Sequence, residues 1–213
     1  MTLLLASSSP RRRELLTRIG VSFTVVPSRV DEDDVARRLD AGGTAAPETL
    51  VTRLAAAKAR EVAGRPDTPA GALVLAADTV VVLDGDVLGK PADPADARRM
   101  LARLSGRVHR VVSGVALARA GGGDLLVDAE VTEVQIAPLA PDVIARYVAT
   151  GEPLDKAGAY AVQGLGSIFV ERVHGCYFNV VGLPLARTAR LLERFGLRVP
   201  DLWHPGNPAV RAT

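Results

Sequence analysis

Cysteine and aromatic residues are scarce in this 213-residue chain, and long apolar runs are missing. The single cysteine, Cys176, excludes an internal disulfide framework and is typical of a reducing compartment. Aromatic residues make up 4% of the sequence, which leaves few rings on which nucleic-acid bases could stack. No apolar run reaches the roughly 18 residues of a membrane helix, so we expect no membrane contact.

Signatures of several other protein classes are also missing. The three histidines, His109, His174 and His204, are scattered, and no Cys/His cluster has the spacing of a zinc site. The GxxxxGK pattern of a Walker loop is absent. The first apolar run, Leu3–Ala6, is too short for a secretion signal and is followed by arginines, so we expect a cytoplasmic protein.

The composition is that of a globular protein with nearly balanced charge. Hydrophobic residues account for 48% and charged residues for 23% of the chain, which excludes a disordered protein. The 26 Lys and Arg against 24 Asp and Glu give a net charge of +2. Together with the few aromatic residues, this balance argues against a stable nucleic-acid complex. A homodimer is compatible with the sequence, which carries no feature specific for one.

Helices and strands are predicted to alternate along the chain. Strands are predicted over residues 3–6, 23–26, 108–118, 125–136 and 167–173, with further strands within 73–91, and helices from Pro10 to Gly20 and over 47–64, 94–104, 141–150 and 185–195. The acidic segment Val30–Asp34 is predicted as a loop. This order indicates an α/β fold with a mixed, twisted sheet flanked by helices, in a single domain over residues 1–200 with a tail at 201–213.

The segment ASSSPRRREL places hydroxyl groups and positive charge at the start of the first helix. Ser9 is predicted to cap this helix and Pro10 to occupy its first position. A helix N-terminus binds anions, and arginine has a planar fork that matches phosphate oxygens. Arg11 and Arg12, nearest the turn, are the candidate phosphate ligands. The alternative is an ordinary helix start with solvated arginines.

Asp78 interrupts an apolar run, between LVLAA and TVVV. A carboxylate there is unfavourable unless it is paired, bound to a metal or placed at a strand end facing a cleft. Lys90 follows a predicted hairpin turn at Asp84-Gly85 and could return to the same cleft. The alternative is that Asp78 is a turn or cap residue.

The segment DKAGAYAVQGLG, Asp155 to Gly166, is predicted as a glycine-rich loop with a helical turn. Its glycines allow a ligand to approach the backbone closely, and the Gln163 amide can both donate and accept at a base edge. The alternative is a tight structural loop with a salt bridge at Asp155.

Three other candidates each have an unremarkable alternative. Glu32 lies in an acidic segment that would ordinarily be solvated, although a magnesium site needs carboxylates. Lys58 lies at the border of the apolar face of its helix, where a solvated lysine is the default. Cys176 is interpreted as a small buried residue and not as a nucleophile.

Five segments in this order, ASSSPRRREL, AADTVV, LGKP, LSGRVHRVVSGVAL and DKAGAYAVQGLG, resemble the Maf family of nucleoside triphosphate pyrophosphatases, once described as septum formation inhibitors. The resemblance runs from Leu3 to about Phe195. It implies a two-lobed α/β fold with a deep cleft, similar to inosine triphosphate pyrophosphatases. It also implies hydrolysis of a nucleoside triphosphate to the monophosphate and pyrophosphate with a divalent cation, Mg²⁺ or Mn²⁺.

The resemblance also assigns roles to individual residues. Asp78 matches the family's proton-accepting aspartate. The phosphate-binding and cleft positions fall on Ser7, Arg11, Arg12, Glu32, Lys58 and Lys90. Glu32 and Asp78 are the expected metal ligands, although the sequence does not decide whether Asp78 is a base or a ligand.

Arg11, Thr79 and Gln163 match a subgroup that acts on dTTP and UTP and on some modified pyrimidine triphosphates. The other subgroup carries tryptophan, glutamine and glutamate at these positions and acts on 7-methyl-GTP. The alternatives to a dTTP/UTP pyrophosphatase are therefore a 7-methyl-GTP pyrophosphatase and a nucleotide-binding regulator of septum formation that acts without catalysis.

Overall fold

The structure is a computed structural model that describes residues 1–40, 46–204 and 207. The chain divides into two compact units. The first unit consists of Met1–Asp78, Ser113–Glu130 and Gly182–Thr213, and the second consists of Thr79–Val112 and Val131–Val181.

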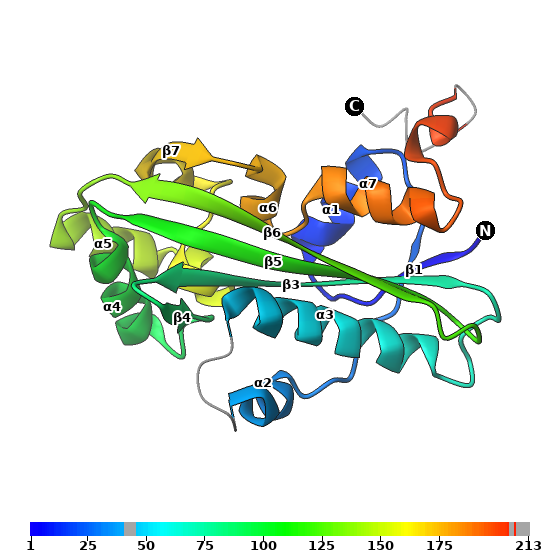
Figure 1. The fold of residues 1–213 in the computed structure, drawn as a ribbon. Coiled ribbons are helices and arrows are strands. Elements are labelled where there is room, and N and C mark those ends of the chain that lie inside the picture. Colours follow the sequence, from blue (N-terminus) through cyan, green and yellow to red (C-terminus); the bar gives the residue numbers. More distant parts are fainter. Residues whose placement is uncertain (41–45, 205–206, 208–213) are drawn as a thin grey trace. The chain divides into compact units, whose positions relative to one another are not determined.

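A seven-stranded sheet with strand order β2-β1-β3-β5-β6-β7 supplies strands to both units, and β4 pairs with β3 (Figure 1). The strands are β1 (Leu3–Leu5), β2 (Thr24–Val25), β3 (Leu73–Leu83), β4 (Asp86–Leu88), β5 (Val108–Arg119), β6 (Leu125–Ile136) and β7 (Val170–His174). Strand β1 is parallel to β2 and β3, whereas β4 is antiparallel to β3 and β7 to β6. The predicted α/β class with a mixed sheet is confirmed.

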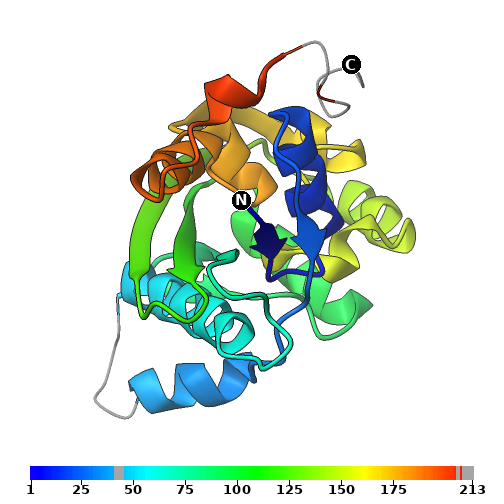
Figure 2. The same cartoon turned by 90° about the vertical axis from the view of Figure 1, so that its right-hand side faces the viewer.

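The first unit has helices on both faces of its part of the sheet. They are α1 (Pro10–Arg18), α2 (Glu32–Asp40), α3 (Pro47–Ala63) and α7 (Leu185–Arg194), followed by a short 3₁₀ helix, η4 (Val199–Leu202). Helix α3 covers one face, α1 and α7 lie on the other, and α2 packs on the outer side of α3 (Figure 2). Small residues let α3 approach the sheet closely, among them Ala55, Ala59, Ala76 and Ala116.

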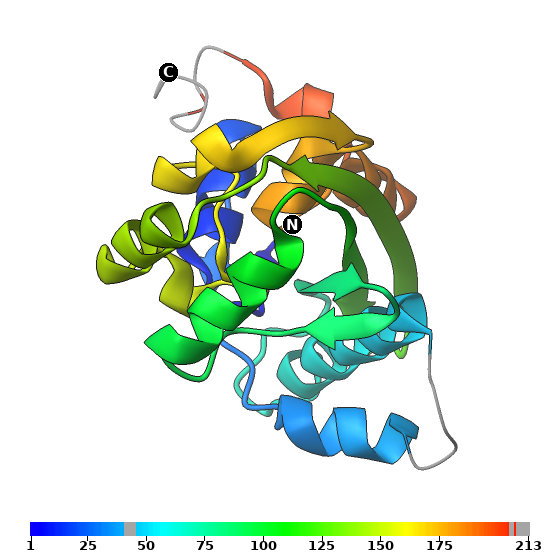
Figure 3. The ribbon, with the colours of Figure 1, turned by 90° about the vertical axis from the view of Figure 1, so that its left-hand side faces the viewer.

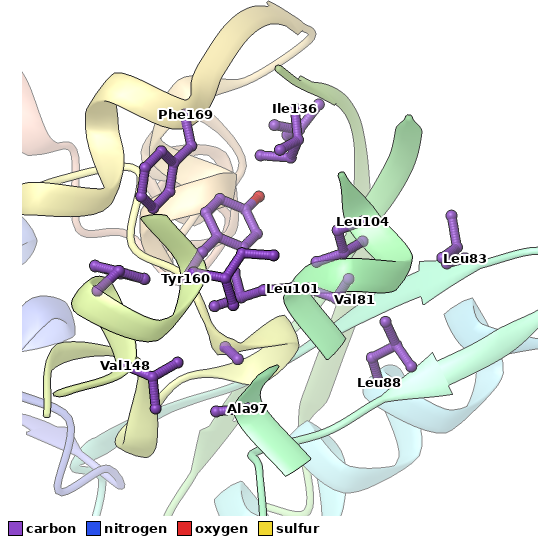
Figure 4. Close-up of a cluster of buried hydrophobic side chains, with 14 of the residues drawn as sticks. Val81, Leu83, Leu88, Ala97, Leu101, Leu104, Ile136, Val148, Tyr160 and Phe169 are labelled. Carbon is purple, nitrogen blue, oxygen red and sulfur yellow. The ribbon is translucent and has the colours of Figure 1, made fainter. Parts of the chain in front are cut away.

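The second unit packs helices and short turns around an apolar core. Its helices are α4 (Pro94–Leu104), α5 (Pro141–Ala149) and α6 (Tyr177–Val181), with 3₁₀ turns η1 (Glu152–Asp155), η2 (Ala157–Ala159) and η3 (Leu165–Phe169). Helix α4 packs against α5 (Figure 3). Side chains such as Leu101, Ile136, Tyr160 and Phe169 fill the core (Figure 4).

Most element predictions agree with the structure, but two are wrong and one further helix was missed. The acidic loop prediction at Val30–Asp34 is wrong because α2 begins at Glu32, where Asp31 Oδ1 accepts a hydrogen bond from the Asp34 amide at 3.0 Å and caps the helix. The strand predicted from Ser167 begins only at Val170, after η3. Helix α6 was not predicted.

The end of the chain is partly packed where the structure describes it. Trp203 Nε1 donates to the Ile19 carbonyl at 2.9 Å, and the buried Asn207 donates to the Gly20 carbonyl at 2.9 Å. The prediction of one domain over residues 1–200 with a separate tail stays a prediction. Within the described residues, no helix combines the length and the apolar character needed to span a bilayer.

Candidate functional site

The serine and arginine segment begins where β1 ends and leads directly into α1. Ser9 caps the helix as predicted, because its side chain accepts from the Arg12 amide at 3.5 Å. Ser7 is buried, and its Oγ accepts from the Ser9 amide at 3.2 Å and from Arg12 Nη1 at 3.3 Å. Ser7 therefore links the end of the strand to the first turn of the helix.

The arginines of this segment differ in their surroundings. Arg12 donates from Nε to the Gly182 carbonyl at 2.9 Å, which connects the start of α1 to the segment before α7. Burial lowers the pKa of the Arg12 guanidinium from its ordinary value, against the opposing effect of the negative charges on Asp78 and Glu32. Arg11 is half-buried and Arg13 is exposed. The charge of Arg12 therefore interacts with those of Asp78 and Glu32.

Lys58, Asp78 and Glu32 form a cluster of charges in the first unit. Lys58 Nζ lies 2.6 Å from Asp78 Oδ1 and 2.7 Å from Glu32 Oε1. The side chains of Lys58 and Asp78 are only 9% and 10% exposed, whereas that of Glu32 is 58% exposed. A buried ammonium and a buried carboxylate each need such a partner, because an unpaired charge in this place would be strongly unfavourable.

This cluster excludes two of the alternatives that the sequence left open. Lys58 is buried and paired, and is not the solvated lysine that its helix position suggests. Asp78 lies within β3, which continues to Leu83, so it is neither a turn or cap residue nor at a strand end. Of the arrangements considered for Asp78, pairing with a cation is the one observed.

The segment before α2 is fixed to α3 and so places Glu32. Glu61 Oε2 accepts hydrogen bonds from Ser28 Oγ at 3.0 Å and from the Arg29 amide at 3.1 Å. Arg65 binds both carboxylate oxygens of Glu61, and this interaction above all lowers the pKa of Glu61 to about 2. Glu61 therefore stays charged across the neutral range and ties this segment to the helix that carries Lys58.

A divalent cation would find two oxygen ligands in this cluster. Asp78 and Glu32 both contact the same ammonium, so their carboxylates lie close to one another. Magnesium prefers oxygen ligands and commonly binds one or two carboxylates together with substrate phosphates. The described residues contain no group of three or more His, Cys, Asp or Glu that could hold a metal. The two carboxylates are thus fewer than the three side-chain ligands of a preformed metal site, and substrate phosphates would have to supply the other oxygens.

In the second unit, the segment of Lys90 and the glycine-rich segment lie together. The Gly158 amide donates to the Gly89 carbonyl at 3.0 Å. Gly158 has a φ of 69°, and a Cβ there would lie 2.8 Å from Val81 Cγ2, so glycine is required both for its conformation and for its contact with β3. Lys90 itself is exposed, and Thr79 is half-buried at the start of this unit.

Gln163 lies in the glycine-rich segment, between the Ala161 amide, which donates to Tyr147, and the Leu165 and Gly166 amides, which donate to Glu152. Its side chain is half-buried, and its amide has no hydrogen-bond partner among the described residues. The salt bridge at Asp155 that the alternative reading named is present, because Lys156 Nζ lies 2.5 Å from Asp155 Oδ1. The predicted loop with a helical turn is observed as η1, η2 and the residues up to η3.

Two residues that organise this segment were not identified from the sequence. Glu152 and Tyr147 contact its backbone amides, and neither stands out by composition or spacing. The sequence could have pointed to Glu152 only by its position, three residues before Asp155, where the glycine-rich segment begins. The structure thus joins Ser7 to Arg12, and Lys58 to Asp78 and Glu32, in the first unit. Thr79, Lys90 and Gln163 lie in the second unit, and the single cleft stays a prediction.

Comparisons with known proteins agree on one family. The family described as Maf-like protein matches residues 2–195. A protein of Moorella thermoacetica named dTTP/UTP pyrophosphatase is 54% identical over 202 residues, which cover 94% of this chain and 97% of that protein. Proteins of the same name from Symbiobacterium thermophilum and an Anaeromyxobacter species are each 53% identical, covering 91% and 97% of this chain and 94% and 95% of their own lengths.

One solved structure, that of the Staphylococcus aureus Ham1 protein, covers 80% of both chains. It shares 14% sequence identity with this chain, at a TM-score of 0.42. Similarity at this level does not by itself establish a common fold.

Proposed function

The chain belongs to the Maf family, and from this premise we propose that it hydrolyses dTTP and UTP to the monophosphate and pyrophosphate. The curated relatives that carry this activity in their name support the proposal, because they are 53–54% identical over more than nine tenths of this chain. The observation that carries it is the buried Lys58–Asp78 pair with Glu32 beside it, in a unit that also carries Ser7 and Arg12.

In the proposed reaction, water attacks the α-phosphorus and the bond to the bridging oxygen of the β-phosphate breaks. Asp78 would accept the proton of the attacking water, or orient that water, since a carboxylate is a general base. Negative charge grows on the phosphoryl oxygens and on the leaving pyrophosphate. Arg12 and Lys58 would stabilise that charge, with Ser7 donating from the start of α1.

A divalent cation, Mg²⁺ or Mn²⁺, is proposed as the cofactor, with Asp78 and Glu32 as its ligands. When bound, it would neutralise charge on the phosphates and on the leaving group. Lys58 would keep the two carboxylates paired until a cation and a triphosphate arrive, because its ammonium contacts both. Its flexible stem would then allow it to turn to a phosphate oxygen.

Recognition of the base is proposed for the residues that match the pyrimidine subgroup. Uracil and thymine present two carbonyls flanking an N–H, and an amide such as that of Gln163 can donate to one carbonyl and accept from the N–H beside it. Thr79 and Arg11 would contribute to the same choice, and Lys90 would contact phosphate. We further propose that the protein works in the cytoplasm.

The test is a panel of dTTP, UTP, CTP and 7-methyl-GTP, assayed for pyrophosphate release with Mg²⁺ or Mn²⁺. We expect the highest kcat/KM for dTTP and UTP. A preference for 7-methyl-GTP would replace the substrate assignment. Binding of nucleotides without turnover of any of them would instead support a regulator that acts without catalysis.

A further inference from the structure

Glu152 lies beneath the backbone that follows Gln163 and accepts three hydrogen bonds there. Its Oε1 accepts from the Gly166 amide at 3.0 Å and from the Tyr147 hydroxyl at 2.8 Å, and its Oε2 accepts from the Leu165 amide at 3.0 Å. Consecutive backbone amides that point at one anion form a concave binding site, which a side-chain carboxylate occupies here. The carboxylate thus fixes the chain directly after Gln163.

The two glycines on this side of Gln163 are required by the carboxylate and its tyrosine partner. Gly164 has a φ of 83°, and a Cβ on it would lie 2.5 Å from Glu152 Oε2. A Cβ on Gly166 would lie 2.6 Å from the Tyr147 hydroxyl and 2.8 Å from the Ala161 carbonyl. The glycine pattern around Gln163 is therefore explained by close contact with Glu152 and Tyr147.

Tyr147 extends the same arrangement to the other side of Gln163. Its hydroxyl accepts from the Ala161 amide at 3.1 Å while it donates to Glu152, and its ring packs edge-on against Phe169 with centroids 4.9 Å apart. Burial raises the pKa of the Tyr147 hydroxyl above its ordinary value, so the hydroxyl keeps the proton that it donates. Burial also acts to raise the pKa of Glu152, but hydrogen bonds from Gly166, Leu165 and Tyr147 outweigh it and lower that pKa.

We propose that Glu152, together with Tyr147, is a positioning residue that sets the Gln163 amide for reading the pyrimidine edge. The chain is fixed at Ala161 before Gln163 and at Leu165 and Gly166 after it, through one connected pair of side chains. The amide itself has no partner among the residues the structure describes, so the fixed backbone is what directs it. The pyrimidine substrate in this inference rests on the proposed function. The fixed position of the backbone around Gln163 rests on the hydrogen bonds alone.

The first experiment measures hydrogen exchange of the amides at 161–166 in wild type and Glu152→Gln. Glutamine keeps the volume, but its NH₂ group would face the Leu165 amide in place of an acceptor. We expect exchange at Leu165 and Gly166 to become at least about tenfold faster, since hydrogen bonds to a charged group are lost. The matched control is Glu171→Gln. The Glu171 carboxylate accepts a hydrogen bond from Gln135 Nε2 at 2.9 Å and accepts none from residues 161–166, all of which the structure describes. Unchanged exchange in Glu152→Gln would overturn the inference.

The second experiment compares kcat/KM for UTP, for CTP and for a base-free ribose 5′-triphosphate. In Glu152→Gln the UTP-to-CTP ratio should fall about tenfold while turnover of the base-free substrate stays unchanged. Combining Glu152→Gln with Gln163→Ala should reduce the ratio no further than Gln163→Ala alone, because one residue acts through the other. Tyr147→Phe, which removes only the hydroxyl, should shift the ratio in the same direction by a smaller factor.

The outcomes separate this inference from the proposed function. A wild type that turns over UTP, with a UTP-to-CTP ratio that Glu152→Gln leaves unchanged, overturns the inference alone. A wild type without turnover overturns the proposed function, and the dissociation constants for UTP and CTP then replace the kinetic ratio. Equal losses with all three substrates in Glu152→Gln would show a purely structural role and also overturn the inference.

Discussion

Asp78 in the first unit is a buried carboxylate and Glu152 in the second is a half-buried one, and their partners are of opposite kinds. Asp78 contacts the ammonium of Lys58, at the end of a flexible four-carbon stem. Glu152 contacts two backbone amides and a tyrosine hydroxyl. An ammonium can turn to another anion, whereas backbone amides change partner only if the chain moves. The first arrangement suits a group that takes part in chemistry, and the second suits a group that fixes shape.

Exposure of the neighbouring groups does not follow this division, because exposed residues border both carboxylates. Glu32, the second carboxylate on Lys58, is 58% exposed, so water and ions reach the edge of the charge cluster. Around Glu152, Leu165 and Gly164 are exposed, whereas Tyr147 and Gly166 are buried. A Cβ on Gly164 would collide with the carboxylate, and one on Gly166 would collide with the tyrosine. The two regions therefore differ in the kind of contact and not in exposure, and we expect the first to exchange its partners and the second to stay fixed.

The largest effect is expected for Asp78→Asn. Asparagine keeps the shape and an acceptor for Lys58 but cannot take a proton from water, so pyrophosphate release from dTTP should fall about 10²–10⁴-fold. Asp86→Asn is the matched control, since Asp86 is exposed and pairs with Arg103 at 2.6 Å on the surface. A rate for Asp78→Asn close to that of wild type would remove Asp78 from its proposed role.

Lys58→Met tests how far Asp78 depends on its cation. The variant leaves the buried Asp78 without the ammonium at 2.6 Å, so the free energy of unfolding should fall by about 3–5 kcal/mol. The double variant Lys58→Met with Asp78→Asn should recover part of the loss, because no buried charge remains unpaired. Urea denaturation of the three proteins measures both effects. A loss below about 1 kcal/mol in the single variant would show that Asp78 is readily solvated.

His109 is a third kind of buried group, because it has no charged partner. Its Nε2 lies 2.9 Å from the Tyr160 hydroxyl, and its Nδ1 has no hydrogen-bond partner within the described part of the chain. Burial lowers the pKa of His109 from 6.5 to about 4. The unfolded chain therefore binds a proton at higher pH than the folded chain does. The contribution of the neutral His109 to the free energy of unfolding is therefore complete above about pH 6.5, and it is lost as the pH falls towards 4.

The expected loss between pH 7 and pH 4 is about 3 kcal/mol of unfolding free energy. The measurement compares how the free energy of unfolding depends on pH in wild type and in His109→Leu. The two proteins have the same carboxylates, and only the imidazole is missing from the variant. Parallel pH profiles for the two proteins would show that His109 does not stay neutral in the folded state.

The fold could be predicted from sequence wherever local chemistry decided it. Pro47–Ala63 has helical periodicity, and Asp93 caps α4 with a 2.7 Å bond to the Asp96 amide, so both helices were predicted closely. The hairpin turn at Asp84-Gly85 was predicted from its residues, and both have a positive φ. Helix α2 was missed altogether because consecutive acidic residues resemble a solvated loop, although they suit the first turn of a helix.

The candidate site was less predictable, because its contacts join residues far apart in the chain. The buried Lys58 forms ion pairs with Asp78 and Glu32, and the periodicity of its helix carries no information about these pairs. Glu152 accepts from amides at residues 165 and 166, and any carboxylate before a glycine-rich segment looks the same in sequence. Residue types could nominate Asp78 and Gln163, but their partners needed the fold.

The smallest effect is expected for Cys176→Ser, which changes a side chain in a region fixed by backbone contacts. Thr132 Oγ1 accepts from the Cys176 amide at 3.1 Å and donates to the Cys176 carbonyl at 3.2 Å, and serine keeps both groups. Because the proposed attack is by water, pyrophosphate release should stay within about threefold of wild type. Thermal melting would confirm that the variant is folded. Loss of turnover in a folded variant would point to a covalent thiol intermediate and would move the chemistry away from Asp78.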